Sequence, residues 1–360
     1  MTYEQESGTI RVLVVDDSAF MRTALTRMIQ SDGSLTVVAA AADGQEALEK
    51  ISQVQPDVVT LDVEMPGLNG LETLRRIMRE APRPVLMVRS LTQEGAEATL
   101  EALDCGAFDY VPKQLSDASL DVIQIRDDLV AKIKAAAESK RKKPARRVRD
   151  SAPVAAVYPG IAGQVASAII SIGTSTGGPK ALQEVLPMLP ADLPVGVVIV
   201  QHMPPGFTGP FARRLNKLCK VAVREAQHND SVEAGVIYIA PAGQQMTVSR
   251  STALKTTIRL SNHPPNMLHV PSVDVLMLSV AEAFRSSAMG IILTGMGSDG
   301  ALGMKAILDA GGITVGQDAA SCTVYGMPRT CAERGILQRV VPLERIPEQV
   351  LIATCYRRRA

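Results

Sequence analysis

A serine that could act as a nucleophile lies in the stretch Gly173-Thr-Ser175-Thr-Gly177, between an apolar run and a helical segment. This stretch matches G-x-S-x-G, the sharp turn that exposes a serine hydroxyl at the top of a sheet. A helix that begins near Pro179 would add backbone amides and a positive dipole end, which stabilise a developing oxyanion. The same glycine-rich loop could instead cradle a phosphate, although it has no G-K-[ST] as in a Walker A loop.

A serine nucleophile needs a base, and one of the four histidines is well placed for that role. His202 closes the strand-like run VGVVIVQ. Because neighbouring parallel strands end at one crevice, His202 should lie at the same sheet edge as Ser175. A third group, Asp299, follows the run IILT and could orient the histidine and stabilise its protonated form. These residues predict a Ser-His-Asp triad.

A second triad remains open from the residues alone. Ser175 could work with Asp230 and with either His263 or His269, in the chain order Ser, Asp, His that α/β-hydrolases use. The fourth histidine, His228, lies in a polar turn.

The turn around Asp299, GMGSDGALG, has a second interpretation. Gly295-x-Gly297-x-x-Gly300 after a strand and before a helical stretch fits the fingerprint of a dinucleotide-binding turn, with Asp318 at a plausible distance for a ribose contact. The turn therefore either holds a carboxylate for catalysis or binds a cofactor.

A separate group of acids lies near the N-terminus. Asp16 and Asp17 follow the run RVLVV, and Asp62 ends the run DVVTL. Three carboxylates at one sheet edge repel each other unless a hard cation such as Mg²⁺ joins them. Lys113 follows a later strand and adds an ammonium to this edge. The set suits phosphoryl transfer onto Asp62, with the cation and Lys113 neutralising the phosphoryl oxygens.

The elements that would position these residues form two α/β domains. From residue 11 to about 135, five apolar runs alternate with helical segments, which predicts a doubly wound (βα)5 domain with a parallel sheet. Strand and helix patterns resume at residue 166 and predict a second α/β domain with a mainly parallel sheet. We therefore expect domains over residues 1–135 and 166–360, joined by a linker over 136–165.

Composition narrows the class of protein. A length of 360 residues favours two domains, and the net charge of +1 argues against nucleic-acid binding as the main role. Residues 1–125 hold roughly 20 acids against roughly 10 bases, so the two domains differ in charge. The five cysteines form no CxxC pair, which favours a reducing compartment. No signal peptide or membrane-spanning run is evident, so we expect a cytoplasmic protein without membrane insertion.

The linker carries seven basic residues between Lys140 and Arg149. Such a run could bind a polyanion, or it could be a solvated hinge.

Residues 10–135, with VVDDS, TLDVEMPGLNG and the lysine after the fifth strand, resemble the receiver domain of bacterial response regulators. The resemblance implies that Asp62 is the phosphoacceptor and that Asp16 and Asp17 are acids on the metal side. It also implies that the Glu64 carbonyl is a further Mg²⁺ ligand and that Lys113 contacts the phosphate.

Two positions depart from the receiver pattern. Receivers usually carry Ser or Thr at the end of the fourth strand, where this chain has Arg89, and Ser90 one step on should point to the opposite face. An arginine there could pair with Asp62 in the unmodified state. The lysine is followed by Gln114, where receivers usually have proline. These departures put signal transmission in doubt.

The motifs SIGTSTGGP, QHMPPGFT and LTGMGSDG, after a receiver, are similar to those of the chemotaxis protein-glutamate methylesterase family, CheB. The resemblance covers almost the whole chain. It implies hydrolysis of glutamyl methyl esters on chemotaxis receptors, and often deamidation of glutamines. It further implies Ser175 as nucleophile, His202 as base, Asp299 as orienting acid, and the Thr176 and Met296 amides at the oxyanion.

The resemblance also implies the cofactor and partners. Mg²⁺ would serve phosphorylation of the receiver, while ester hydrolysis needs no metal or organic cofactor. The partners would be methyl-accepting receptors as substrates and a chemotaxis-type histidine kinase as phosphodonor. We expect phosphorylation of Asp62 to relieve a block of the second domain by the first.

Two other classes compete with this interpretation. One is a DNA-binding response regulator, although the second domain is long for a helix-turn-helix module and has no recognition helix rich in Lys and Arg. The other is a dinucleotide-dependent enzyme built on the turn at Gly295.

Overall fold

The chain divides into two units, residues 1–144 and 145–360. The computed structural model describes residues 8–89, 93–113, 119–141, 167–252, 255–264 and 267–356. The domain boundary predicted at residue 135 falls inside the last helix of the first unit. Ser90, Gln114 and most of the basic linker lie outside the described residues.

The first unit is built around a five-stranded parallel sheet, as the sequence predicts, and its strand order is β2-β1-β3-β4-β5. Its strands are β1 (Ile10–Val15), β2 (Leu35–Ala41), β3 (Val58–Asp62), β4 (Val85–Arg89) and β5 (Asp109–Pro112). All five residues of β3 and of β4 are buried, as in a sheet covered on both faces.

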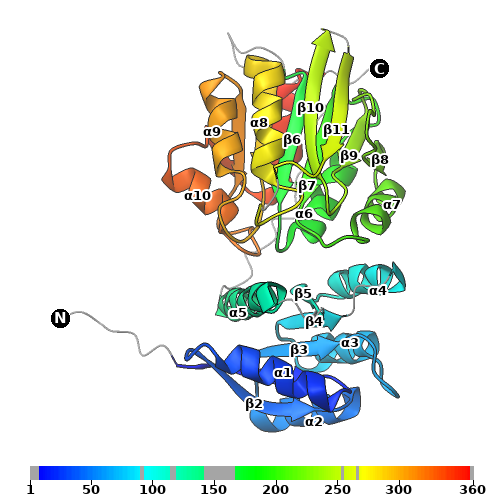
Figure 1. Cartoon of the computed structure of the whole chain (residues 1–360), viewed down its shortest axis with the longest axis vertical. Coiled ribbons are helices and arrows are strands. Elements are labelled where there is room, and N and C mark those ends of the chain that lie inside the picture. The colour runs from blue at the N-terminus through cyan, green and yellow to red at the C-terminus, as the bar shows by residue number, and fades with distance from the viewer. Residues whose placement is uncertain are drawn as a thin grey trace, which may run out of the picture. The chain divides into compact units, whose positions relative to one another are not determined.

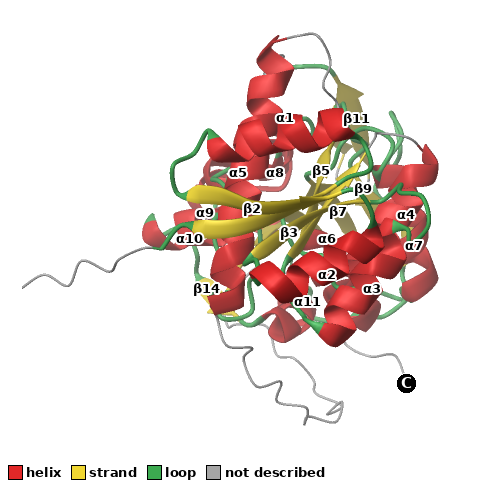
Figure 2. Ribbon diagram, turned by 90° about the horizontal axis from the view of Figure 1, so that it is seen from below, coloured by secondary structure: helices red, strands yellow, loops and turns green. Residues whose placement is uncertain are grey.

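The helices of the first unit cover both faces of this sheet. They are α1 (Ala19–Gln30), α2 (Gly44–Val54), α3 (Gly70–Glu80), α4 (Gln93–Asp104) and α5 (Ser119–Arg141). In Figure 2, α1 and α5 lie on one side of the strands, and α2 and α3 lie on the other. Polar caps start several helices. Asp43, for example, accepts a hydrogen bond from the Glu46 amide at the beginning of α2, while Glu46 Oε2 accepts one from the Ala42 amide.

The second unit contains a seven-stranded parallel sheet in the order β14-β13-β12-β6-β7-β9-β8. Its strands are β6 (Ile169–Thr174), β7 (Gly196–Gln201), β8 (Ala222–Glu225), β9 (Val236–Ile239), β12 (Ala288–Ile292), β13 (Ile313–Gln317) and β14 (Arg339–Val341). The sequence predicts β6, β7, β9 and β12. The prediction of a mainly parallel α/β fold is confirmed.

An antiparallel hairpin stands apart from this sheet and was not predicted. It pairs β10 (Gln245–Thr252) with β11 (Lys255–Ser261). Figure 1 shows the hairpin beside α8, which lies next to α9 on its other side. The described helices are α6 (Gly178–Val185), α7 (Thr208–Leu218), α8 (Val273–Phe284), α9 (Ala301–Asp309), α10 (Met327–Glu333) and α11 (Ile346–Ala353). Short 3₁₀ turns cover Leu186–Met188, Arg285–Ser287 and Leu343–Arg345.

The order of strands places the predicted site residues together. Strand β6 lies between β12 and β7, so the segments after these three strands meet at one sheet edge. Ser175, Asp299 and His202 follow these strands, one each. Among the described helices, none is long and apolar enough to span a bilayer.

Candidate active site

His202 and Asp299 are directly bonded at this edge. His202 Nε2 lies 2.8 Å from Asp299 Oδ2, and both side chains are 9% exposed. His202 Nδ1 is buried and has no hydrogen-bond partner in the described part of the chain. The pairing predicted between the base and its orienting acid is therefore present.

The carboxylate of Asp299 is held by four further donors, three of them at the start of α8. The Ser272 hydroxyl and the Asp274 amide donate to Oδ1 over 2.9 and 3.0 Å, and the Val273 amide donates to Oδ2 over 2.7 Å. The Gly300 amide adds a bond of 3.1 Å to Oδ1. These bonds bring the carboxylate to a helix N-terminus, where the dipole favours negative charge.

These contacts fix the charge state of Asp299. Burial alone would raise its pKa, but the hydrogen bond and charge of His202, with the Val273 and Asp274 amides, hold the pKa well below its usual range. An ionised Asp299 can only accept, so Nε2 of His202 carries the hydrogen. Nδ1 of the neutral ring is then the free base.

Ser175 lies at the same edge, with its side chain partly exposed. Its amide donates to the Thr294 carbonyl over 3.1 Å, which ties the serine turn to the segment after β12. The Gln201 side-chain amide donates to the carbonyls of both Ser175 and His202, each over 3.0 Å, and Gln201 is buried. The serine hydroxyl and His202 are not hydrogen-bonded in this state. Catalytic bonds of this kind often tighten only when substrate binds.

The glycines of the turn that follows β12 allow a close backbone approach to the serine. A Cβ on Gly295 would lie 2.9 Å from the Ser175 Cβ, nearer than real side chains come. The amides of Thr176 and Met296 make no hydrogen bond within the described residues. They are thus free to donate to an oxyanion beside Ser175.

The residues of the alternative interpretations are engaged elsewhere. Asp230 accepts a hydrogen bond from the Gln227 amide and lies 3.6 Å from Arg224, while His263 is exposed. The Asp318 carboxylate accepts from the amide and hydroxyl of Ser321. His269 does reach the site, but as a ring stacked on His202.

The acids of the first unit also converge as predicted. Ligand atoms of Asp16, Asp17 and Asp62 all lie within 4.8 Å of one another. Lys113 Nζ is 2.8 Å from Asp16 Oδ2 and 2.6 Å from Asp62 Oδ2. Only one ammonium, paired with two of the acids, lies among these three carboxylates, and this excess of negative charge fits a divalent cation such as Mg²⁺.

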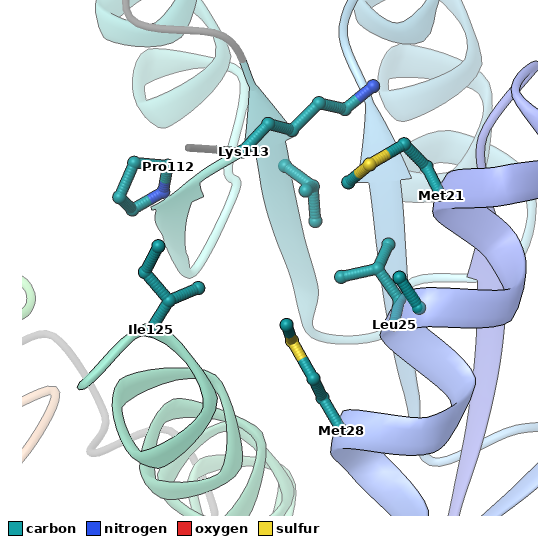
Figure 3. Close-up of a pocket in the computed structure, with 8 residues that line it drawn as sticks. Met21, Leu25, Met28, Pro112, Lys113 and Ile125 are labelled. Carbon is teal, nitrogen blue, oxygen red and sulfur yellow. The ribbon is translucent and has the colours of Figure 1, made fainter. Parts of the chain in front are cut away.

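The titration of this group differs from that of Asp299. Burial raises the pKa of Asp62, Lys113 lowers it, and Asp16 raises it again. Burial lowers the pKa of Lys113, but hydrogen bonds to Asp16 and Asp62 raise it above its ordinary value overall, so Lys113 stays charged. Figure 3 shows the lysine stem passing an apolar crevice, with its ammonium directed away from Met28 and Ile125.

Arg89 does not pair with Asp62, so that suggestion is wrong. Its guanidinium lies 3.1 Å from Glu64 Oε1 and 3.4 Å from Thr99 Oγ1. The carboxylate of Asp62 bonds instead to Lys113 and to the Glu64 amide, 3.2 Å away. The arginine packs against Gly95, where a Cβ would collide with the guanidinium. A glycine in α4 therefore leaves room for Arg89 to turn from Asp62.

Sequence reasoning missed several residues that hold the site. Gln201, Gln245 and Ser272 are buried and bond to the segments that carry Ser175, His202 or Asp299. Ser272 carries a signal that could have been found, because a serine before Val-Asp and an apolar helix is typical of an N-cap. The two glutamines carry no comparable signal.

Both units are similar to known protein families. Residues 170–350 match the CheB methylesterase family, and residues 12–123 match the response regulator receiver domain. The chain is 46% identical to a protein-glutamate methylesterase/protein-glutamine glutaminase of Oleidesulfovibrio alaskensis, with 96% of this chain and 99% of the relative covered. It is 48% identical to such a protein of Symbiobacterium thermophilum, with 95% and 96% covered.

A solved structure is similar to the second unit. The CheB methylesterase catalytic domain of Thermotoga maritima is 36% identical and gives a TM-score of 0.50, with 52% of this chain and 98% of that chain covered.

Proposed function

Because the chain belongs to the CheB family of protein-glutamate methylesterases with a receiver domain, we propose that Ser175, His202 and Asp299 carry out its ester hydrolysis. The observation that carries this assignment is the 2.8 Å bond between His202 and an Asp299 carboxylate held by four other donors. A fixed anion of this kind orients the imidazole and stabilises its cation.

Acylation begins at the free nitrogen of His202. Nδ1 takes the Ser175 proton as the serine oxygen attacks the ester carbonyl carbon, and the carbonyl electrons move to the oxygen. The Thr176 and Met296 amides donate to this oxyanion. When the tetrahedral intermediate collapses, the imidazolium gives its proton to the departing methoxide, which leaves as methanol. A glutamyl ester of Ser175 remains.

Deacylation repeats these roles with water as the nucleophile. His202 removes a proton from the water as it attacks the acyl carbon, and then protonates Ser175 as the carbon–oxygen bond to the serine breaks. The product is a free glutamate side chain. Glutamine would follow the same steps with ammonia as the first product, which supports deamidation as a second activity. None of these steps uses a metal or an organic cofactor.

The first unit would regulate this activity through Asp62. Asp16, Asp17, Asp62 and the Glu64 carbonyl would hold Mg²⁺, which neutralises charge on a transferred phosphoryl group. Asp62 would accept that group on its carboxylate, and Lys113 would pair with a phosphoryl oxygen. The excess of negative charge around one lysine supports this assignment.

The partners follow from this chemistry. The substrates would be glutamyl methyl esters on methyl-accepting chemotaxis receptors, and a chemotaxis-type histidine kinase would supply the phosphoryl group. We place the enzyme in the cytoplasm, a reducing compartment that suits its five free cysteines.

Release of methanol from methylated receptor by the full chain tests the assignment. We expect Ser175→Ala to lower the rate at least about 10³-fold, because the nucleophile is lost. Ser251→Ala, a change at an exposed serine of the β10–β11 hairpin, should leave the rate unchanged. Undiminished methanol release by the Ser175→Ala variant would sink the assignment.

A further inference from the structure

A second imidazole lies flat against the proposed base. The ring centroids of His269 and His202 are 4.0 Å apart, and their planes differ by 14°. His269 belongs to the loop between β11 and α8, far from His202 in the sequence. Two aromatic rings at this distance and angle are stacked with nearly parallel planes.

The His202 ring needs such a contact to keep its plane. The bond from Nε2 to Asp299 holds one atom of the ring, but that atom lies close to the Cβ–Cγ axis, so the bond only weakly restrains rotation of the ring about this axis. Nδ1, at the other side of the ring, is bonded to nothing in the described residues, so no second hydrogen bond sets where it points. Packing against a flat neighbour is then what directs Nδ1.

The segment that carries His269 is itself firmly held. Its carbonyl accepts a hydrogen bond of 3.2 Å from the side chain of Gln245, a residue of β10 with no exposed surface. The other end of that side chain accepts from the Ser272 amide over 2.8 Å, and the Gly243 amide donates to Val270 over 3.0 Å. The backbone that carries the His269 ring is therefore held by Gln245 of the hairpin and by Gly243 just before it.

The same segment also contacts the acid of the triad. Ser272, three residues after His269, donates its hydroxyl to Asp299 Oδ1. One short stretch thus touches both His202 and Asp299, and it sets the position of each relative to the other.

We propose that His269 is a positioning residue, which fixes the plane of the His202 ring by stacking and so aims Nδ1 at Ser175 and at the leaving group. The proposal rests on the assignment of His202 as the base. The proposed role needs the flat ring of His269 and not a charge on it, because two imidazolium cations 4.0 Å apart would repel each other when His202 takes up the serine proton.

The test uses the full chain and one glutamyl peptide as two esters, methyl and p-nitrophenyl. Methoxide must receive a proton from His202 to leave, whereas p-nitrophenoxide leaves without one. In the His269→Ala variant we expect kcat for the methyl ester to fall about tenfold or more, with KM within about twofold. The loss with the p-nitrophenyl ester should be smaller, because that ester needs Nδ1 only to take the protons of Ser175 and water and not to protonate the leaving group.

Two further variants make the result specific. His269→Phe keeps a flat ring without a titrating group and should restore most of the methyl-ester activity. Leu268→Ala changes the neighbouring side chain, which is 79% exposed, and should behave like the wild type. Thermal unfolding of each variant shows whether the fold is kept.

Several outcomes would overturn the proposal. Full methyl-ester activity in a folded His269→Ala variant means that the stack is not needed. A loss confined to the p-nitrophenyl ester, or a Phe variant as slow as the Ala variant, means that His269 merely supports its loop or acts by other chemistry. If the Ala variant does not fold, the comparison of Phe with wild type decides alone. Failure of the proposed function shows separately, as activity that survives Ser175→Ala.

Discussion

Asp62 in the first unit and Asp299 in the second occupy the same kind of position and have opposite properties. Each follows or ends a parallel strand, each is largely buried, and each lies within 3 Å of a nitrogen of a basic side chain. The pKa of Asp62 is raised by burial, whereas that of Asp299 is lowered despite burial. The partner charge alone does not explain the difference.

The neighbours of each carboxylate explain it. Asp299 accepts from His202, a hydroxyl and three amides, two of which begin a helix. Asp62 accepts from Lys113 and one amide, and it shares that lysine with Asp16. Complete hydrogen bonding makes Asp299 a fixed anion that orients a base. Incomplete bonding among like charges leaves Asp62 reactive toward a cation and a phosphoryl group.

The largest expected effect comes from neutralising the fixed anion. Asp299→Asn removes the charge that stabilises the His202 cation, and an amide can hold the ring in the wrong tautomer. We expect kcat for methanol release to fall about 10³- to 10⁴-fold, as for an orienting acid in a triad. Steady-state kinetics on methylated receptor measure this, and a loss below tenfold contradicts the role assigned to Asp299.

Removal of divalent metal should abolish phosphorylation at Asp62 and leave ester hydrolysis at the triad intact. In excess EDTA, labelling of the full chain by a small phosphodonor should fall to background, because three carboxylates then lack their cation. Unstimulated ester hydrolysis should stay within about twofold, since the triad uses no metal. Recovery of labelling with added Mg²⁺ is the control. A parallel loss of both activities would mean that the two acids do not differ in this way.

The sequence predicts the chemical groups of both sites better than it predicts the contacts that set their charge and orientation. The acids, the serine and the base could be predicted because each lies next to a buried strand, and parallel strands bring their ends together. The contacts that tune them come from elsewhere. Asp299 owes its charge to the start of α8, and His202 owes its plane to a loop after an antiparallel hairpin. Neither pairing follows from periodicity, because both join segments far apart in the chain.

Arg89 shows the same limit in the first unit. The sequence gives its place at the end of β4, next to Asp62 by strand order, but not the direction of its side chain. The direction of the side chain depends on Gly95 in α4, which leaves room for the guanidinium, and on Glu64 after β3, with which it pairs. Packing between elements therefore decides which of two acids an arginine meets.

A smaller expected effect is the change in the free energy of unfolding at acid pH. Asp299 has a lowered pKa in the folded state, so its stabilisation is present above the ordinary value of 3.8 and is lost as the pH falls below it. Asp62 has a raised pKa, so the cost of burying its charge disappears as the pH falls. Between pH 5 and 2, the stability lost by the wild type relative to Asp299→Asn should be on the order of 2 kcal/mol.

Urea unfolding at a series of pH values measures the contributions of Asp299 and Asp62 to the free energy of unfolding. The difference between wild type and Asp62→Asn should change in the opposite direction to the difference for Asp299→Asn. Parallel pH dependence of the two differences would show that the carboxylates titrate alike.

Methanol release from methylated receptor, with and without a small phosphodonor and Mg²⁺, tests the division of roles most directly. Wild type, Asp62→Asn and Asp299→Asn are compared as full chains. We predict that the phosphodonor raises the wild-type rate, that Asp62→Asn keeps the unstimulated rate but does not respond, and that Asp299→Asn is inactive in both conditions. Loss of the unstimulated rate in Asp62→Asn, or a full response to the phosphodonor in that variant, would contradict this account.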